Sequence, residues 1–196
     1  MVAGSALFAS AAFCADGKSL YAACIACHGA RGEGVAATGA PKIAGSAQWY
    51  VERQLKAFAS GERGRQPGDT FGAAMGAAGV TLASDKERAT VAAYVAALPP
   101  VQAVASAANA NGRNYFNAIC SACHGSNGLG NETLGAPRLA GVEPKYLERQ
   151  LAAFKSGRRG GRDSDRLGAQ MRAISAMLPD PRTEQDVIAY AASLKP

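Results

Sequence analysis

Apolar side chains recur at helical spacing in three segments of the N-terminal half, and glycine-rich stretches separate these segments. The first segment, residues 16–27, ends in a Cys-x-x-Cys-His pentad. The second follows Ser46 and stops at Gly61, a typical helix end. The third begins with the capping box Ser84-Asp85-Lys86-Glu87 and ends at Pro99. No alternation with a period of two is sustained, so the pattern predicts an all-α fold.

The C-terminal half repeats the N-terminal half with an offset of 96 residues, which carries Cys24 onto Cys120. The repeat predicts helices at about 111–123, 144–156 and 183–194. We therefore expect two tandem domains, residues 16–98 and 109–196, joined by an uncharged linker at 99–108 that is rich in Pro and Ala. The same offset joins Cys27, His28, Pro41, Gly45, Arg53, Gln54 and Met75 to Cys123, His124, Pro137, Gly141, Arg149, Gln150 and Met171.

The first fifteen residues resemble the end of a secretory signal, because residues 1–13 are apolar or small. They lack a basic start and are too short to span a bilayer, so residues 1–15 are interpreted as a signal peptide or an N-terminal arm. Cys14 has no adjacent histidine and no counterpart in the second copy, which makes it a removed or spare thiol. No other segment approaches 18 uncharged apolar residues, and we expect the rest of the chain to be soluble.

The two pentads have the form that attaches haem covalently, because closely spaced sulfurs at a helix end can add to both vinyl groups of one porphyrin. The adjoining histidine can then reach the iron. A thioredoxin-like redox pair would need a βαβ setting, and zinc would need four ligands per site, whereas the chain has only two histidines. The sequence predicts two haem c groups, attached through Cys24, Cys27, Cys120 and Cys123, with His28 and His124 as iron ligands.

A second iron ligand is predicted in each copy from the placement of methionine. Met75 and Met171 each lie 47 residues beyond the pentad histidine. A thioether is a soft, neutral ligand that raises the reduction potential and closes the iron to substrate. Methionine can also simply fill a core, which is how we interpret Met177, but equal placement in both copies favours ligation. Because both histidines are used in the pentads, no distal acid–base group remains for peroxidase chemistry, and electron transfer is favoured over catalysis.

Four residues are candidates for supporting the haem groups. The carbonyl groups of Pro41 and Pro137, thirteen residues after each histidine, can accept a hydrogen bond from the imidazole, although loop rigidity alone also explains a proline there. Arg53 and Arg149 can pair with propionates, or they can belong to an exposed helix face. Both interpretations stay open at each position.

Composition supports a buried cofactor and argues against nucleic-acid binding. Hydrophobic residues make up 48% of the chain but aromatic ones only 7%, so a core built of protein alone would be thin, and a macrocycle would supply apolar volume. The formal charge of +6 falls once four propionates are counted, so we infer no nucleic-acid partner. A basic cluster in the second copy can steer an acidic redox partner or form a solvated loop; it comprises Arg158, Arg159, Arg162, Arg166 and Arg172.

The chain resembles the dihaem cytochromes of the cytochrome c4 family over nearly everything from residue 16 onward. The resemblance rests on the paired pentads, each followed by glycine, on the segments at 41–45 and 137–141, and on those at 50–55 and 146–151. It implies two class I cytochrome c folds related by a pseudo-twofold axis, His/Met ligation at both irons, and a periplasmic role in passing electrons toward a terminal oxidase. Around Met75 the sequence is richer in small residues than the family pattern.

Three functions compete at this point. The first is a soluble shuttle that takes electrons from a quinol-oxidising complex or a dehydrogenase and gives them to a terminal oxidase, with any association with the membrane occurring through these partners. The second is a tightly bound electron-acceptor subunit of a dehydrogenase, such as a flavocytochrome that oxidises sulfide. The third is an enzyme acting at an open haem, which requires Met75 or Met171 to be absent from the iron.

Overall fold

The computed structural model describes residues 16–101 and 107–195, and these residues are helical apart from loops and two isolated β-bridges. The described residues form two compact units, one made of 16–61 and 70–101 and the other of 62–69 and 107–195. The proposed signal at 1–15, Cys14, and residues 102–106 of the proposed linker lie outside the described residues. Within the described ranges no helix is long and apolar enough to cross a membrane.

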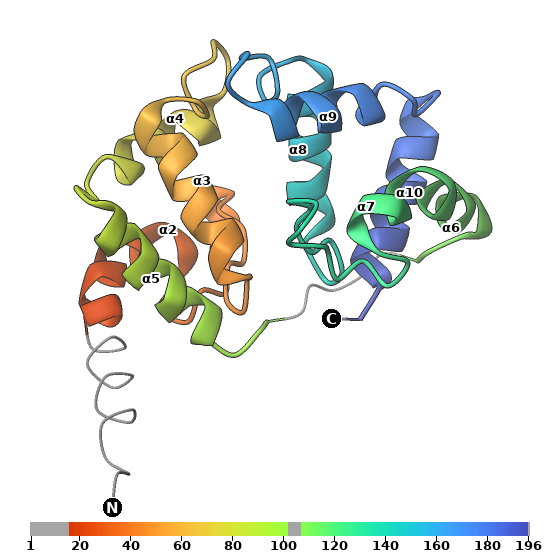
Figure 1. Cartoon of the computed structure of the whole chain (residues 1–196). Helices are drawn as coiled ribbons and strands as arrows, with labels where there is room; N and C mark the ends of the chain where they lie inside the picture. The colour runs from red at the N-terminus through yellow and green to blue at the C-terminus, as the bar shows by residue number, and fades with distance from the viewer. Residues whose placement is uncertain (1–15, 102–106, 196) are drawn as a thin grey trace, which may run out of the picture. The chain divides into compact units, whose positions relative to one another are not determined.

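The first unit packs α3 against both α4 and α5, and this contact builds its core (Figure 1). Tyr21, Leu82, Val91 and Val95 form the buried centre. Residues 16–21 are also helical and lead into the pentad. The named elements of this unit are η1 (Ala22–Cys24), α2 (Ile25–His28), η2 (Ala36–Thr38), α3 (Gln48–Ser60), α4 (Thr70–Gly79) and α5 (Asp85–Ala97).

The second unit repeats this arrangement, with α10 packed against α6 and α8 and with α8 against α9 (Figure 1). Its buried centre is formed by Phe116, Leu178, Val187 and Ala191. Its elements are α6 (Ala110–Tyr115), η3 (Phe116–Cys120), α7 (Ser121–His124), α8 (Pro144–Lys155), α9 (Arg166–Ser175) and α10 (Pro181–Ser193).

Helix caps explain where the last helix of each unit begins. The capping box predicted at the start of α5 is confirmed: the Glu87 amide donates to Ser84 Oγ at 3.2 Å, and the Ser84 amide donates to Glu87 Oε2 at 3.0 Å. In α10 the matching position is Asp180, whose carboxylate accepts from the Thr183 amide at 2.9 Å. Different side chains therefore perform the same capping function in the two copies.

The helices α4 and α9 were not predicted, although each carries a candidate methionine ligand. In α4 the sequence contains Gly72, Gly76 and Gly79 among alanines, so it has low helix propensity and no polar stripe to define a face. Tertiary packing supplies what propensity lacks, because α3 packs against this helix.

The core positions upstream of the pentads do not follow the 96-residue offset. Tyr21 and Phe116 are the largest fully buried residues of their units, at 1% and 0% exposure, and they are 95 residues apart. Each packs its ring on a tyrosine of the last helix, with centroids 5.3 Å apart for Tyr21 and Tyr94 and 5.4 Å apart for Phe116 and Tyr190. These two pairs are structurally equivalent, so the second copy holds one extra residue between this ring and its first cysteine.

The turn that precedes each pentad absorbs this difference. In the first unit η1 is a tight 3-10 turn, whereas in the second unit η3 is a π-helical turn of five residues. A π turn holds more residues per turn than an α-helix, and a 3-10 turn holds fewer. The local change in winding therefore brings each pentad to the equivalent position in its own unit, although the segment between the buried ring and the first cysteine is one residue longer in the second unit.

A close approach of α6 to α10 depends on Gly112. A Cβ atom at this position would lie 2.1 Å from the Asp186 carbonyl oxygen, which belongs to the backbone and has little freedom to move. We expect Gly112→Ala to lower the free energy of unfolding of the second unit by about 2–3 kcal/mol, because overpacking forces the helices apart. Chemical denaturation of the holoprotein measures this loss. Asn114→Ala, at an exposed position of the same helix, serves as the control, and equal stability of the two variants would contradict the packing argument.

Candidate functional site

Each pentad ends a short helix with its histidine as the last helical residue, in α2 and in α7. The chain then turns sharply at Gly29 and Gly125, whose φ angles of 80° and 77° favour glycine. Cys24 and Cys120 are half-buried, whereas the second cysteine of each pentad is exposed, and all four thiols are free. The backbone thus presents two thiols and one imidazole within a single turn in each unit.

Both imidazoles are buried and held by a proline carbonyl. His28 Nδ1 lies 2.9 Å from the Pro41 oxygen, and His124 Nδ1 lies 2.8 Å from the Pro137 oxygen. A carbonyl only accepts hydrogen bonds, so Nδ1 carries the proton in each ring and Nε2 presents a lone pair. Burial lowers the pKa of His124, against an opposing effect of this hydrogen bond. In the second unit the neutral imidazole, which is the form that binds a metal, is therefore favoured.

The second pentad holds a buried polar atom that is ready for a ligand. Nε2 of His124 is buried and has no hydrogen-bond partner within the described part of the chain. A buried nitrogen of this kind is costly unless it is satisfied, and coordination of a metal ion satisfies it. The donor set therefore fits an iron atom on this side of the imidazole.

Glycines fix the loop that carries each proline. The Gly34 amide donates to the His28 carbonyl at 2.8 Å, and the Gly130 amide donates to the His124 carbonyl at 2.8 Å. A Cβ atom would lie 2.9 Å from the Ala40 carbonyl at Gly34, and 2.6 Å from the equivalent carbonyl at Gly130. Sequence reasoning did not single out these glycines, although the 96-residue offset relates them.

The first cysteine of each pentad lacks the lowered pKa of a reactive redox thiol. Burial raises the pKa of Cys24 and, to about 11, that of Cys120; the neighbouring thiol of each pentad raises it further. Catalytic thiols of the thioredoxin kind instead have lowered pKa values. The raised pKa values of Cys24 and Cys120 therefore argue against the thioredoxin-like alternative.

The candidate methionine ligands occupy matching positions in the two units. Met75 lies in α4 and Met171 in α9, and both side chains are half-buried. One helical turn earlier, Phe71 and Leu167 expose 48% and 37% of their surface, and residues four apart share a helix face. Each methionine thus belongs to an uncovered apolar face that a flat macrocycle can bury. Met177 is 58% exposed, so its interpretation as a packing residue was wrong.

The two candidate arginines lie on α3 and α8, and each guanidinium stacks over aromatic rings. Arg53 Cζ lies 5.0 Å from the ring centroid of Trp49, and Arg149 Cζ lies 5.9 Å from that of Tyr146. These contacts orient both guanidinium groups along their helices. Their pairing with propionates stays a prediction.

The residues present in each unit fit a covalently bound haem c. The thiols, the oriented imidazole, the half-buried thioether and the exposed apolar face together meet its attachment, ligation and burial requirements. Such a group supplies a reversible one-electron change at iron, while the protein controls its ligands and its exposure to water.

Comparison with known proteins agrees with this assignment. The family model described as cytochrome c matches residues 14–99 and again 109–195. A thiosulfate dehydrogenase electron acceptor of Stutzerimonas stutzeri is 34% identical, over 82% of this chain and 80% of its own. Cytochrome c4 of Azotobacter vinelandii is 30% identical, over 92% of this chain and 87% of its own. The crystal structure of reduced cytochrome c4 from Pseudomonas stutzeri superposes with a TM-score of 0.69 at 28% identity, covering 91% of this chain and 95% of that one.

The duplicated match and the duplicated site lead to the same conclusion. Both units are cytochrome c domains, and their Cys-x-x-Cys-His pentads account for two covalent haem c groups. Membership places the chain among electron-transfer proteins rather than enzymes. This chain therefore belongs to the cytochrome c family, as a dihaem protein of the cytochrome c4-like kind.

Proposed function

We propose that this dihaem protein is a periplasmic shuttle of a respiratory chain, which accepts electrons from a quinol-oxidising complex or a dehydrogenase and delivers them toward a terminal oxidase. The observation that carries the proposal is the duplicated site, in which a proline carbonyl orients each buried imidazole and a methionine recurs at the same position. An iron held by both a histidine and a methionine of this chain would be suited to carrying electrons and not to binding substrate.

In this proposal Met75 and Met171 would hold the haem irons together with His28 and His124, one methionine and one histidine at each iron. Neutral thioether sulfur favours the reduced iron and thereby raises the reduction potential. The apolar face beside each methionine, which includes Phe71 and Leu167, excludes water from the site. The chain's contribution is therefore fixed ligation, so that little reorganisation accompanies each electron.

The carbonyl groups of Pro41 and Pro137 hold the imidazoles in this proposal. A hydrogen bond from Nδ1 fixes the tautomer and the ring plane, and it makes Nε2 a stronger donor toward iron. Arg53 and Arg149 are proposed to balance the propionate charge from their positions on α3 and α8. Residues 1–15 are proposed as the export signal, in keeping with covalent haem attachment outside the cytoplasm.

A second candidate function is that of an electron acceptor held by a dehydrogenase. The relative from Stutzerimonas stutzeri supports it, because that protein is a thiosulfate dehydrogenase electron acceptor and shares 34% identity with this chain. In that case the donor is a dehydrogenase that oxidises a reduced sulfur compound, and the complex persists during turnover.

Co-purification distinguishes the two candidates. The holoprotein is purified without a fusion tag from the periplasmic fraction of the source organism. It is then passed through a sizing column at about micromolar concentration, at which transient complexes dissociate. The shuttle proposal expects the haem absorbance to elute at the size of a single chain. Elution together with a dehydrogenase in stoichiometric amount would establish the acceptor-subunit function instead.

A further inference from the structure

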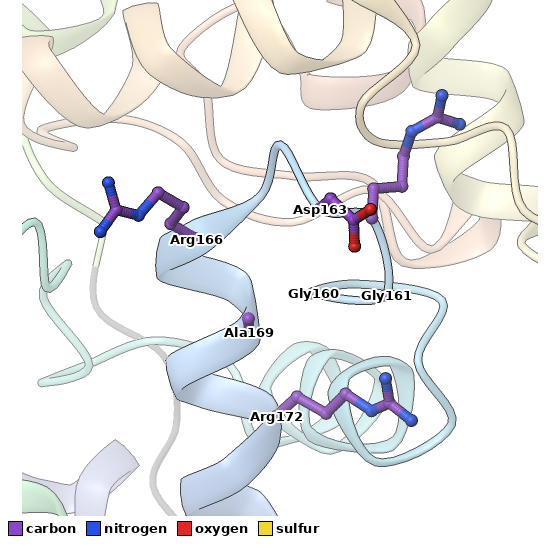
Figure 2. A pocket seen from close by; sticks show the side chains of 7 residues that line it. Gly160, Gly161, Asp163, Arg166, Ala169 and Arg172 are labelled. Carbon is purple, nitrogen blue, oxygen red and sulfur yellow. The ribbon is translucent and has the colours of Figure 1, made fainter.

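The second unit carries an arginine-lined depression on its surface at the start of α9 (Figure 2). Its volume is about 460 Å³, and it is formed by the loop before α9 and by one face of that helix. Its charged lining consists of Arg162, Arg166 and Arg172 with one carboxylate, that of Asp163. All four side chains are exposed, and no ion pair or side-chain hydrogen bond engages the three arginines within the described residues.

The duplicated chain supplies an internal comparison for these arginines. The first copy of the repeat has Gln66, Thr70 and Gly76 at the three corresponding positions, of which Thr70 and Gly76 lie in the equivalent helix, α4. Across residues 158–172 the second copy has five arginines and two aspartates, whereas residues 62–76 have two arginines and two acidic residues. Because the same fold forms without the additional positive charge, the arginines of the second unit are not required by the fold.

The loop that carries Arg162 is held in one conformation by a carboxylate. Asp165 caps α9 by accepting from the Gly168 amide at 2.8 Å, and its other oxygen accepts from the Gly160 amide at 3.0 Å. Gly160 has a φ angle of 71°, and a Cβ atom there would lie 2.1 Å from the Gly168 carbonyl oxygen. The loop is thus fixed against the first turn of α9. The backbone position of Arg162 is therefore set in the absence of a partner.

The directions of the side chains favour a broad ligand over a small one. Figure 2 shows the side chains of Arg166 and Arg172 leaving α9 in different directions, and not toward a single point. A single phosphate or sulfate ion would need converging donors. Residues 166, 169 and 172 follow one another at intervals of three and spread over about a third of the circumference of α9, and Met171 lies outside this arc. The positive surface therefore faces solvent without competing for the haem side of the helix.

We propose that Arg162, Arg166 and Arg172 form a docking surface for the acidic face of a redox partner protein, an inference that rests on the proposed electron-transfer function. Complementary charge steers encounter and fixes orientation, whereas it adds less to final affinity.

The test measures binding of the holoprotein to an acidic blue-copper protein, immobilised on a sensor surface, at ionic strengths of about 10 mM and about 150 mM. The triple variant Arg162→Gln/Arg166→Gln/Arg172→Gln is expected to bind on the order of ten-fold more weakly at low salt and to lose most of the salt dependence. Glutamine keeps helix propensity, so α9 is expected to form, and far-UV circular dichroism verifies this. If the triple variant does not fold, the single variants Arg166→Gln and Arg172→Gln replace it, each with a smaller loss expected.

A matched control removes the same charge elsewhere in the same unit. Arg113, Lys145 and Arg182 are exposed, and their triple replacement by glutamine should leave binding within about two-fold of the unmodified protein. Equal weakening of both triple variants, or of neither, would refute the docking surface. If millimolar phosphate competes with the partner at constant ionic strength, the arginines form a small-anion site and not a protein docking surface. If the holoprotein is retained on anionic lipid vesicles, they form a membrane contact instead.

A redox titration of the same preparations distinguishes failure of the docking surface from failure of the proposed electron-transfer function. If two haems titrate reversibly in every variant while binding is insensitive to the arginines, the docking surface fails and the electron-transfer proposal stands. If two reversible centres are absent from the unmodified protein, the proposed function itself fails.

Discussion

Replacing Cys120 and Cys123 together by serine is expected to leave one covalently bound haem per chain. The second pentad supplies both attachment sulfurs of its unit, and its two thiols are free for this chemistry. The measurement is the haem content of the denatured, solvent-extracted protein, by pyridine haemochrome absorbance and by mass. Because denaturation removes haem held only by axial ligands, the result reports covalent attachment alone.

The repeat and the fifth cysteine provide two controls for this experiment. The mirror variant, with Cys24 and Cys27 replaced by serine, should also retain one haem, whereas Cys14→Ser should retain two. Retention of two covalent haems after either double replacement would contradict the assignment of the pentads.

The second large effect is expected from the methionines. Met171→Leu should lower the potential of one haem by on the order of 0.1–0.2 V and open its iron to carbon monoxide, because leucine keeps the volume but cannot ligate. Met75→Leu should do the same to the other haem only. Spectroelectrochemistry of each single variant, with the other site as internal reference, measures both effects.

The exposed methionine of the second unit provides the control for ligation. Met177→Leu removes a thioether that is 58% exposed and has no counterpart in the first copy, so both potentials should stay within experimental error. If Met75→Leu or Met171→Leu leaves its haem unchanged, that methionine is not an axial ligand.

Much of the site followed from the duplication visible in the sequence. Covalent attachment requires a fixed local spacing, so the pentads could be recognised without the fold. The carbonyl groups of Pro41 and Pro137 lie where the sequence placed them, within hydrogen-bond distance of the histidine rings. The start of α5 was also predictable, because a capping box is a local signal.

Other features depend on tertiary packing and were missed. The helix α4 is built from alanine and glycine, which leave no periodic pattern to detect, and its packing on α3 compensates for its weak propensity. Tyr21 and Phe116 are equivalent core residues, but they are 95 residues apart, whereas the rest of the repeat has an offset of 96. A π turn before the second pentad accommodates the extra residue. Gly34 and Gly130 carry no local sequence signal, because the backbone carbonyl groups that exclude a side chain at these positions come close only in the folded loop.

An anaerobic spectroelectrochemical titration of the purified holoprotein, followed by addition of carbon monoxide to the reduced form, tests the central claim most directly. The account predicts two haems per chain that titrate reversibly, each with a methionine-to-iron charge-transfer band when oxidised, and no prompt carbon monoxide binding. One haem per chain, or rapid carbon monoxide binding at either site, would contradict the assignment of two closed electron-transfer centres.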